Sequence, residues 1–286
     1  MLREIRELGF EYVELSHGIS ISLMPDILEA VDAGEVKISS LHNFCPLPMG
    51  ITRPAPNLYE FSAEKDFERE LAIRYTLKTF EFAERLKAKA VVLHLGSIEL
   101  KDYTGRLCDM LERDGKPTLK FEKLRAEAVA KRESVKGMFV AHMYDSVRKL
   151  LPDAEKRGLK LGCENRQALE EIPLENDFAS FFSDFPSPSV VYWHDFGHAQ
   201  IKENLGLISH LAHLESLAGR LTGFHIHDVQ FPDRDHAAPG TGMIDFAMFK
   251  RFVKPEHIKV FELSPGLSSE AVKAGVAHVK RIWGEE

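Results

Sequence analysis

Cysteine is scarce in this chain. Its 286 residues include three cysteines, Cys45, Cys108 and Cys163, and no two of them form a C-x-x-C pair. An odd number without paired spacing argues against a disulfide framework. Such usage is typical of a reducing compartment, so we expect a cytoplasmic protein.

Long apolar runs are also missing. No segment approaches the ~20 consecutive apolar residues that a membrane-spanning helix needs. The N-terminal sequence MLREIRELGF is charged from Arg3 onward and lacks the apolar core of a signal peptide. We therefore expect no membrane span. The oligomeric state stays open, a homo-oligomer included.

Positive charge is in deficit. Lys and Arg number 37 against 44 Asp and Glu, which gives a formal net charge of -7. Because binding to phosphates requires an excess of Lys and Arg, this balance argues against a nucleic-acid partner. Internal repeats, low-complexity segments and a G-x-G-x-x-G after an early strand are absent as well.

The chain does contain a series of short apolar runs. Hydrophobic residues make up 44% of it, enough for a sizeable core. Each run is nearly continuous, as expected of parallel strands that are buried on both faces. We predict seven strands, at Tyr12–Leu15, Lys37–Leu41, Ala90–Leu95, Leu159–Cys163, Val190–Trp193, Leu221–Ile226 and Ile258–Leu263.

The segments between these runs have helical character, and Ala33-Gly34 and Arg157-Gly158 predict helix ends just before strands. Strands that alternate with helices predict an α/β fold, and residues 1–286 suit one TIM-type (β/α)8 barrel domain. An open doubly wound sheet is the alternative. Because we find seven runs and the chain opens inside what reads as the first helix, the first barrel strand is predicted to be missing from this sequence.

Residues 99–133 separate the third and fourth runs and are rich in Lys, Arg and Glu. We interpret this segment as a charged insertion that forms a solvated helix and loop. The alternative is a lid, because long loops on this face of a barrel often cover the substrate.

Metal-binding residue types close the predicted strands. Glu14 closes the first run, and the others end at His42, His94, Glu164, Asp195, His225 and Glu262. An unpaired charge at the end of a buried strand is costly, and in a barrel these ends converge on one mouth. Converging carboxylates repel one another unless a cation lies among them, so the set predicts a site for Zn, Mn, Co or Mg. A buried ion-pair network is the alternative, but no Lys or Arg lies at these strand ends.

Several segments resemble the xylose isomerase-like barrel superfamily. They are SLHNFCP (40–46), VVLHLG (91–96), GCENR (162–166), YWHDFGHA (192–199), GFHIHD (223–228), HAAPGTGMIDF (236–246) and FELSP (261–265). That superfamily includes sugar isomerases, ketose 3-epimerases, inosose dehydratases and apurinic-site endonucleases of the endonuclease IV type. The resemblance implies a barrel with a metal site, and it leaves the substrate open because members share ligands across different reactions.

The isomerase and epimerase pattern implies that one metal is bound by Glu164, Asp195, His225 and Glu262. It further implies that Glu164 and Glu262 form the acid/base pair. His227 competes with His225, because residues two apart on a strand share a face. The H-x-x-D spacing from His225 to Asp228 matches the superfamily and favours His225.

A second metal or the substrate could involve further residues, namely His42, His94, His198, His227, His236 and Arg166. Each has an ordinary alternative, a hydrogen-bonded histidine or, for Arg166, a structural salt bridge. Gly240 and Gly242 in the sequence PGTG suit a phosphate-binding loop and a tight turn equally well.

The function implied by the resemblance is a divalent-metal-dependent isomerase or epimerase of a sugar or polyol, phosphorylated or not. It would transfer a proton through a metal-stabilised enediolate, and an inosose-type dehydratase would share that first step. The alternative from another class is an endonuclease IV-like zinc phosphodiesterase. Eight of its ligand positions have matches, at His42, His94, Glu164, Asp195, His198, His225, His236 and Glu262. Arg234 stands where an aspartate is expected, although a one-residue slip to the flanking Asp233 or Asp235 would restore it. A barrel that binds a metabolite without turnover is a third hypothesis.

Overall fold

The computed structural model describes residues 2–55 and 57–285 and divides the chain into two compact units. The first unit comprises Met1–Ser97, Phe139–Glu164 and Ser180–Val191, and the second comprises Ile98–Met138, Asn165–Ala179 and Tyr192–Glu286. Among the described residues, no helix combines the length and the apolar character needed to cross a membrane.

Parallel strands form the sheet of the first unit in the order of the chain. They are β1 (Tyr12–Leu15), β2 (Lys37–His42), β3 (Ala90–Leu93) and β4 (Lys160–Glu164). In register, Leu41 pairs with both Leu15 and Val91, and Val91 pairs with Leu161. Every residue of β3 is buried, as expected of a parallel strand covered on both faces.

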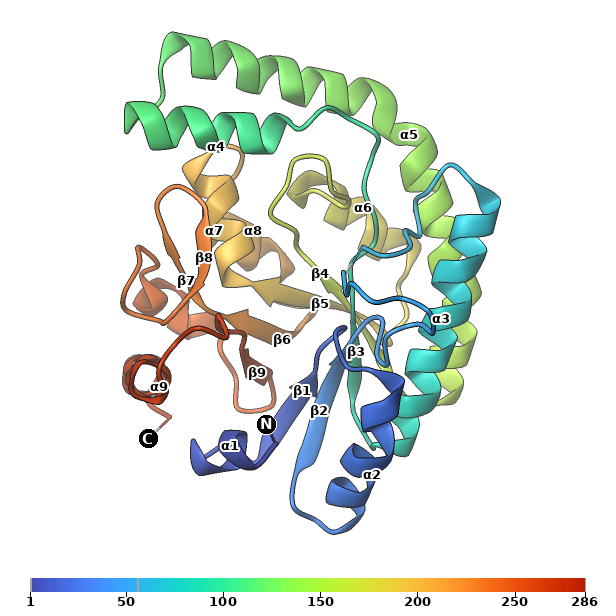
Figure 1. The fold of residues 1–286 in the computed structure, drawn as a ribbon. Coiled ribbons are helices and arrows are strands. Elements are labelled where there is room, and N and C mark those ends of the chain that lie inside the picture. The colour runs from blue at the N-terminus through green and yellow to red at the C-terminus, as the bar shows by residue number, and fades with distance from the viewer. Residues whose placement is uncertain (1, 56, 286) are drawn as a thin grey trace. The chain divides into compact units, whose positions relative to one another are not determined.

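Helices surround these strands. They are α1 (Leu2–Glu7), α2 (Met24–Asp32), α3 (Asp66–Arg85) and the second part of α5 (Leu119–Lys156), with the 3-10 turn η1 (Ile21–Leu23) before α2. α3 and this part of α5 run side by side (Figure 1), where Arg69 Nη1 lies 3.3 Å from His142 Nδ1. Gly34 and Gly158 follow α2 and α5 with φ of 72° and 67°, a conformation that strains other residues. The two predicted helix ends are thus confirmed.

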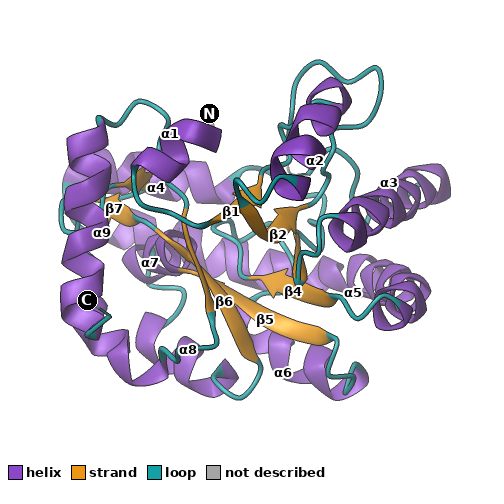
Figure 2. Cartoon of the chain, turned by 90° about the horizontal axis from the view of Figure 1, so that it is seen from below, coloured by secondary structure: helices purple, strands orange, loops and turns teal. Residues whose placement is uncertain are grey.

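The second unit has its own run of parallel strands. They are β5 (Val190–Asp195, of which 192–195 belong to this unit), β6 (Leu221–Ile226) and β9 (Ile258–Phe261). Asp195 pairs with His225, and His225 pairs with Val260; β5 and β6 lie side by side in Figure 2. An antiparallel hairpin follows β6, formed by β7 (Asp228–Gln230) and β8 (Arg234–Ala237). The sequence pattern missed this hairpin because its strands are short and polar.

The helices of the second unit are α4 (Tyr103–Asp114), the first part of α5, the start of α6 (Glu175–Asp184), α7 (Phe196–Asn204), α8 (His210–Leu217) and α9 (Ser269–Trp283), with the 3-10 helix η2 (Phe246–Phe252). α9 packs against η2, where Trp283 Nε1 donates a hydrogen bond of 3.0 Å to Phe246 O. All seven predicted runs form parallel strands, and the two described ranges contain no eighth strand in the parallel sheet.

The charged insertion at 99–133 forms α4 and the first part of α5, which run alongside each other (Figure 1). Its apolar residues pack inward: Tyr103 and Ala128 form a buried cluster with Leu169. Arg132 is also buried and donates to Leu169 O at 3.0 Å and to Asp177 Oδ2 at 2.9 Å. The predicted helical character is confirmed, and the segment is packed into the second unit rather than only solvated.

Gly137 offers a test of the long helix α5. It is exposed, and an added Cβ would meet nothing within 4 Å. Glycine in a helix interior costs about 0.5–1 kcal/mol relative to alanine, through the conformational entropy of the unfolded chain. We expect Gly137→Ala to raise the free energy of unfolding by about this amount, measured by urea denaturation. A variant no more stable than the wild type would contradict the assigned helix.

Candidate metal centre

His42, His94 and Glu164 lie together at the carboxyl ends of β2, β3 and β4 in the first unit. Glu164 Oε2 is 2.8 Å from His94 Nε2 and 3.6 Å from His42 Nε2. All three side chains are buried, and each offers one ligand atom within 4.8 Å of the others. The first unit therefore contains a set of three residues of the types that bind divalent cations.

Neighbouring carbonyl groups orient both imidazoles of this set. His42 Nδ1 lies 3.1 Å from Asn43 O, and His94 Nδ1 lies 2.8 Å from Asn57 Oδ1. Because carbonyl oxygens only accept hydrogen bonds, each Nδ1 carries the proton, and in the neutral ring Nε2 has a lone pair. Metal-binding histidines have this arrangement, with the second ring nitrogen donating to a carbonyl or carboxylate.

Asp195, His225 and Glu262 form the corresponding group in the second unit, at the ends of β5, β6 and β9. His225 Nδ1 is 3.0 Å from Glu262 Oε2 and 3.8 Å from Asp195 Oδ2. Asp195 and His225 are completely buried, whereas the Glu262 side chain is 33% exposed. The group thus joins two carboxylates and one imidazole, and Glu262 is the member that solvent reaches.

His227 plays a different part from His225. The backbone N–H of His236 donates to His227 Nδ1 at 2.9 Å, so Nδ1 is the acceptor nitrogen. His227 Nε2 then carries the proton and donates to Asp195 Oδ2 at 3.1 Å. Both ring nitrogens are occupied, and His227 orients the Asp195 carboxylate.

His198 and Arg166 lie beside this group. Asp195 Oδ1 caps α7 by accepting from the backbone N–H of His198 at 2.7 Å. His198 Nδ1 is 3.1 Å from Arg166 Nη1, and Arg166 Nε donates to Glu171 Oε1 at 2.9 Å. Arg166 is therefore held by a buried ion pair and presents its guanidinium to His198.

His236 in β8 stacks on His227, with ring centroids 4.3 Å apart. Its Nδ1 is 2.9 Å from Asp235 Oδ1, and its Nε2 is 3.8 Å from Glu262 Oε1. Burial opposes protonation, but the two carboxylates outweigh it and raise the pKa of His236 to about 10. A positive charge therefore lies beside Glu262 at neutral pH.

The PGTG loop is held by Asp228, which is completely buried. Asp228 Oδ2 accepts from the backbone N–H groups of Gly240 and Gly242, each at 2.9 Å. A Cβ on Gly242 would lie 2.3 Å from Val229 O. Because these N–H groups already donate to Asp228, the geometry favours the tight turn over a phosphate-binding loop.

Sequence reasoning missed a polar cluster on the other face of β5. It consists of Tyr192, His194, His210 and His213, all buried, and it connects to Asp195 through Asn165. The spacing of His210 and His213, three apart on one helix, was the available signal, since such residues share a helix face.

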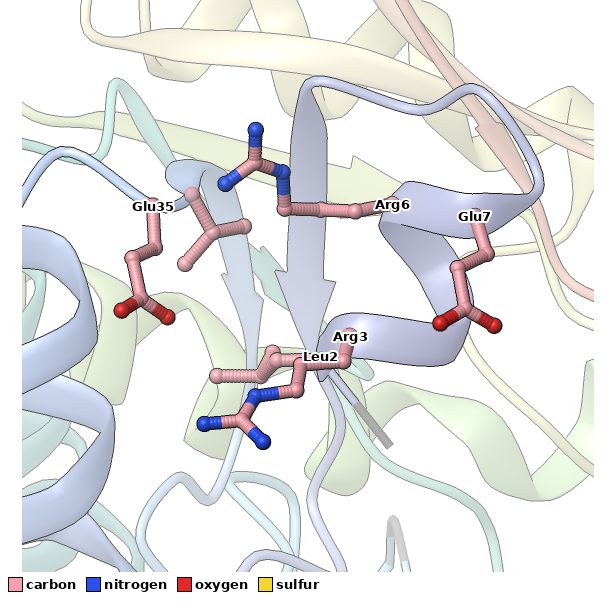
Figure 3. Close-up of a pocket in the computed structure, with 6 residues that line it drawn as sticks. Leu2, Arg3, Arg6, Glu7 and Glu35 are labelled. Atoms are coloured by element: carbon pink, nitrogen blue, oxygen red, sulfur yellow. The ribbon is translucent and has the colours of Figure 1, made fainter.

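A surface hollow of about 360 Å³ lies elsewhere in the first unit, lined by residues of α1 and by Glu35 and Val36 (Figure 3). Val36 immediately precedes β2, whereas His42 ends that strand. The hollow is therefore at the opposite end of β2 from the candidate ligands.

Gly197 provides a test of the contact between α7 and His227. A Cβ at this position would lie 2.0 Å from His227 Cε1. We expect Gly197→Ala to lower the free energy of unfolding by about 1–3 kcal/mol and to displace His227 from Asp195. Gly219→Ala is the matched control, because nothing lies within 4 Å of its added Cβ. Equal unfolding free energies for the two variants, measured in urea, would refute the packing.

The buried histidines predict a loss of stability in acid. Burial and the charges of His213 and Lys202 outweigh Asp195 and lower the pKa of His210 from 6.5 to about 3. Between these two values the unfolded chain binds a proton that the folded chain does not, so stability falls as the pH falls through this window. His210 alone contributes a slope of up to about 1.4 kcal/mol per pH unit. Urea titrations at several pH values should give a shallower slope for His210→Gln, and identical slopes would contradict this.

The chain matches the family model of xylose isomerase-like TIM barrels over residues 2–281. Similar solved structures include a D-tagatose 3-epimerase-like protein (TM-score 0.68, 18% identity, covering 99% of this chain and 93% of that chain). D-psicose 3-epimerase from Clostridium cellulolyticum H10 matches with a TM-score of 0.68 and 12% identity, covering 99% and 92%. An IolI protein with a binding zinc atom matches with a TM-score of 0.64 and 15% identity, covering 99% and 93%. A search of curated proteins found no match. The predicted barrel fold is confirmed, and the chain belongs to the xylose isomerase-like TIM barrel family.

Proposed function

We propose that this protein is a divalent-metal-dependent isomerase or epimerase of a sugar or polyol, phosphorylated or not. The observation that carries the proposal is the group of Asp195, His225 and Glu262, whose ligand atoms lie within 4.8 Å of one another. Two carboxylates this close repel each other, and a cation between them removes the repulsion. The family and the epimerase-like solved structures support the reaction class.

Glu164 is the proposed fourth ligand. It immediately precedes Asn165, whose side chain amide binds the backbone of Asp195. In the first unit its Oε2 also faces His94 and His42, so a second ion held by those histidines would share Glu164. Carboxylate oxygens with one imidazole nitrogen suit Zn, Mn, Co or Mg. When bound, such an ion supplies Lewis-acid polarisation of substrate carbonyl and hydroxyl oxygens.

The proton transfer is assigned to Glu262 and Glu164. Glu262 is the partly exposed carboxylate of the group, so a substrate entering from solvent reaches it. The protonated His236 beside it favours the ionised carboxylate, which is the form that accepts a proton from the carbon next to the carbonyl. Glu164 then donates or accepts the second proton. An inosose-type dehydratase would use the same first step and then lose a β-hydroxyl.

A second candidate, an endonuclease IV-like zinc phosphodiesterase, is favoured by one observation. His42, His94 and Glu164 form a further three-residue group of metal-binding types, as an enzyme with several zinc ions would require. The net charge of -7 opposes a DNA partner.

Metal content after purification and an activity panel separate the isomerase from the nuclease. About one ion per chain, with exchange of substrate C–H hydrogen into deuterated solvent, supports the isomerase class. About three zinc ions per chain with nicking of abasic DNA supports the nuclease.

Two substitutions separate metal binding from proton transfer. Glu262→Gln keeps the shape and one oxygen ligand but removes the basic group, and Asp195→Asn removes a charge without removing a proposed acid or base. We expect Glu262→Gln to lower C–H exchange about 10²–10⁴-fold even at saturating metal. Asp195→Asn should be partly rescued by added metal. Exchange at the wild-type rate in metal-saturated Glu262→Gln would remove Glu262 from the acid/base role.

A further inference from the structure

The side chain of Asn165 binds both backbone polar groups of Asp195. Asn165 Oδ1 accepts from Asp195 N at 2.8 Å, and Asn165 Nδ2 donates to Asp195 O at 3.0 Å. Asp195 ends β5 and caps α7, so its backbone lies where a strand gives way to a helix. Buried backbone groups at such a junction need partners, and the amide of Asn165 supplies them as a neighbouring strand would.

Tyr192 determines which way this amide faces. Its hydroxyl donates to Asn165 Oδ1 at 3.0 Å, which holds the oxygen rather than the NH₂ group toward Asp195 N. With its one proton committed, the hydroxyl oxygen has lone pairs left to accept hydrogen bonds. They face His194 Nδ1 at 2.8 Å and His213 Nε2 at 2.7 Å. If the Asn165 amide were flipped, its NH₂ group would face two donors, the Asp195 N–H and the Tyr192 hydroxyl.

Two histidines donate to the Tyr192 hydroxyl, and a third lies beside one of them. His194 Nδ1–H donates to Tyr192, so His194 Nε2 is an acceptor, and His210 Nε2 lies 3.0 Å from it. His194, His210 and His213 are at most 5% exposed. Apolar side chains would fill this space at lower cost, because a buried polar network must be fully satisfied. The network therefore specifies an orientation that apolar packing would not.

We infer that Asn165 and Tyr192 are positioning residues that fix the backbone of Asp195 and thereby aim its carboxylate. With the backbone held, Oδ1 caps α7 and Oδ2 meets His227 and lies toward His225. This inference deepens the proposed function and rests on it for the role of Asp195 as a metal ligand. Partners that orient ligands in this way typically contribute 10–100-fold to metal affinity.

Tyr192→Phe tests the inference, because it removes the hydroxyl and keeps the ring. The matched control is Tyr103→Phe, which removes one hydroxyl hydrogen bond of 3.0 Å, to Glu127, in the same unit. The first readout is the Kd for Mn²⁺, which we expect to rise about tenfold in Tyr192→Phe and to stay unchanged in the control. The second is amide hydrogen exchange by NMR, in which Asp195 N–H and His198 N–H should exchange about tenfold faster in Tyr192→Phe only.

The two readouts separate this inference from the proposed function. A wild type that binds no divalent ion would overturn the proposed function, and amide exchange would still decide the positioning role. Unchanged exchange at both amides in Tyr192→Phe would overturn the positioning role whatever the metal affinity. If Tyr192→Phe fails to fold, Asn165→Leu replaces it, since an apolar side chain of similar size can neither accept from Asp195 N nor donate to Asp195 O. The same two amides should then exchange faster than in Tyr103→Phe, and equal exchange would overturn the inference.

Discussion

Asp195 is a completely buried carboxylate, and residues of the second unit supply hydrogen bonds to both of its carboxylate oxygens and to its backbone. The N–H of His198 meets Oδ1, His227 meets Oδ2, and Asn165 binds the backbone on either side of the side chain. Burying a charge without such partners would cost several kcal/mol. Satisfying it in this way requires close approach, which explains Gly197: any larger residue on α7 would occupy the space of the His227 ring.

The partners of Asp195 leave one direction for further coordination. His225 and Glu262 lie there, and Glu262 alone in that group is substantially exposed. Asp195 is thus buried and hydrogen-bonded, whereas Glu262 is accessible to solvent. This difference matches their proposed roles as metal ligand and proton-transfer group. A fixed ligand needs rigidity, whereas a proton-transfer group needs access to the substrate. The charge of His236 lies at the accessible end.

The family match fixes the fold class but leaves the reaction to the site, because one fold can host different chemistries. The group of His42, His94 and Glu164 is where those chemistries would diverge. If the protein binds one ion, these two histidines are available to bind substrate hydroxyl groups. If it binds more, they would be ligands of the additional ions. The Nδ1 protons of both histidines are directed at Asn43 and Asn57, which leaves each Nε2 facing Glu164.

The sequence by itself determined the seven strands and the residues that end them. Parallel strands covered on both faces must be continuously apolar, so a His, Asp or Glu that ends such a run stands out without any tertiary information. Only the tertiary structure showed that His225 faces Glu262 whereas His227 donates to Asp195, because the partners of each ring come from other segments of the chain. It likewise showed that the backbone N–H groups of the PGTG loop donate to Asp228. It also revealed the hydrogen bond between Tyr192 and Asn165 and the three histidines beside it. These features depend on which donor meets which acceptor across separate strands and helices, and no periodicity within one segment encodes that pairing.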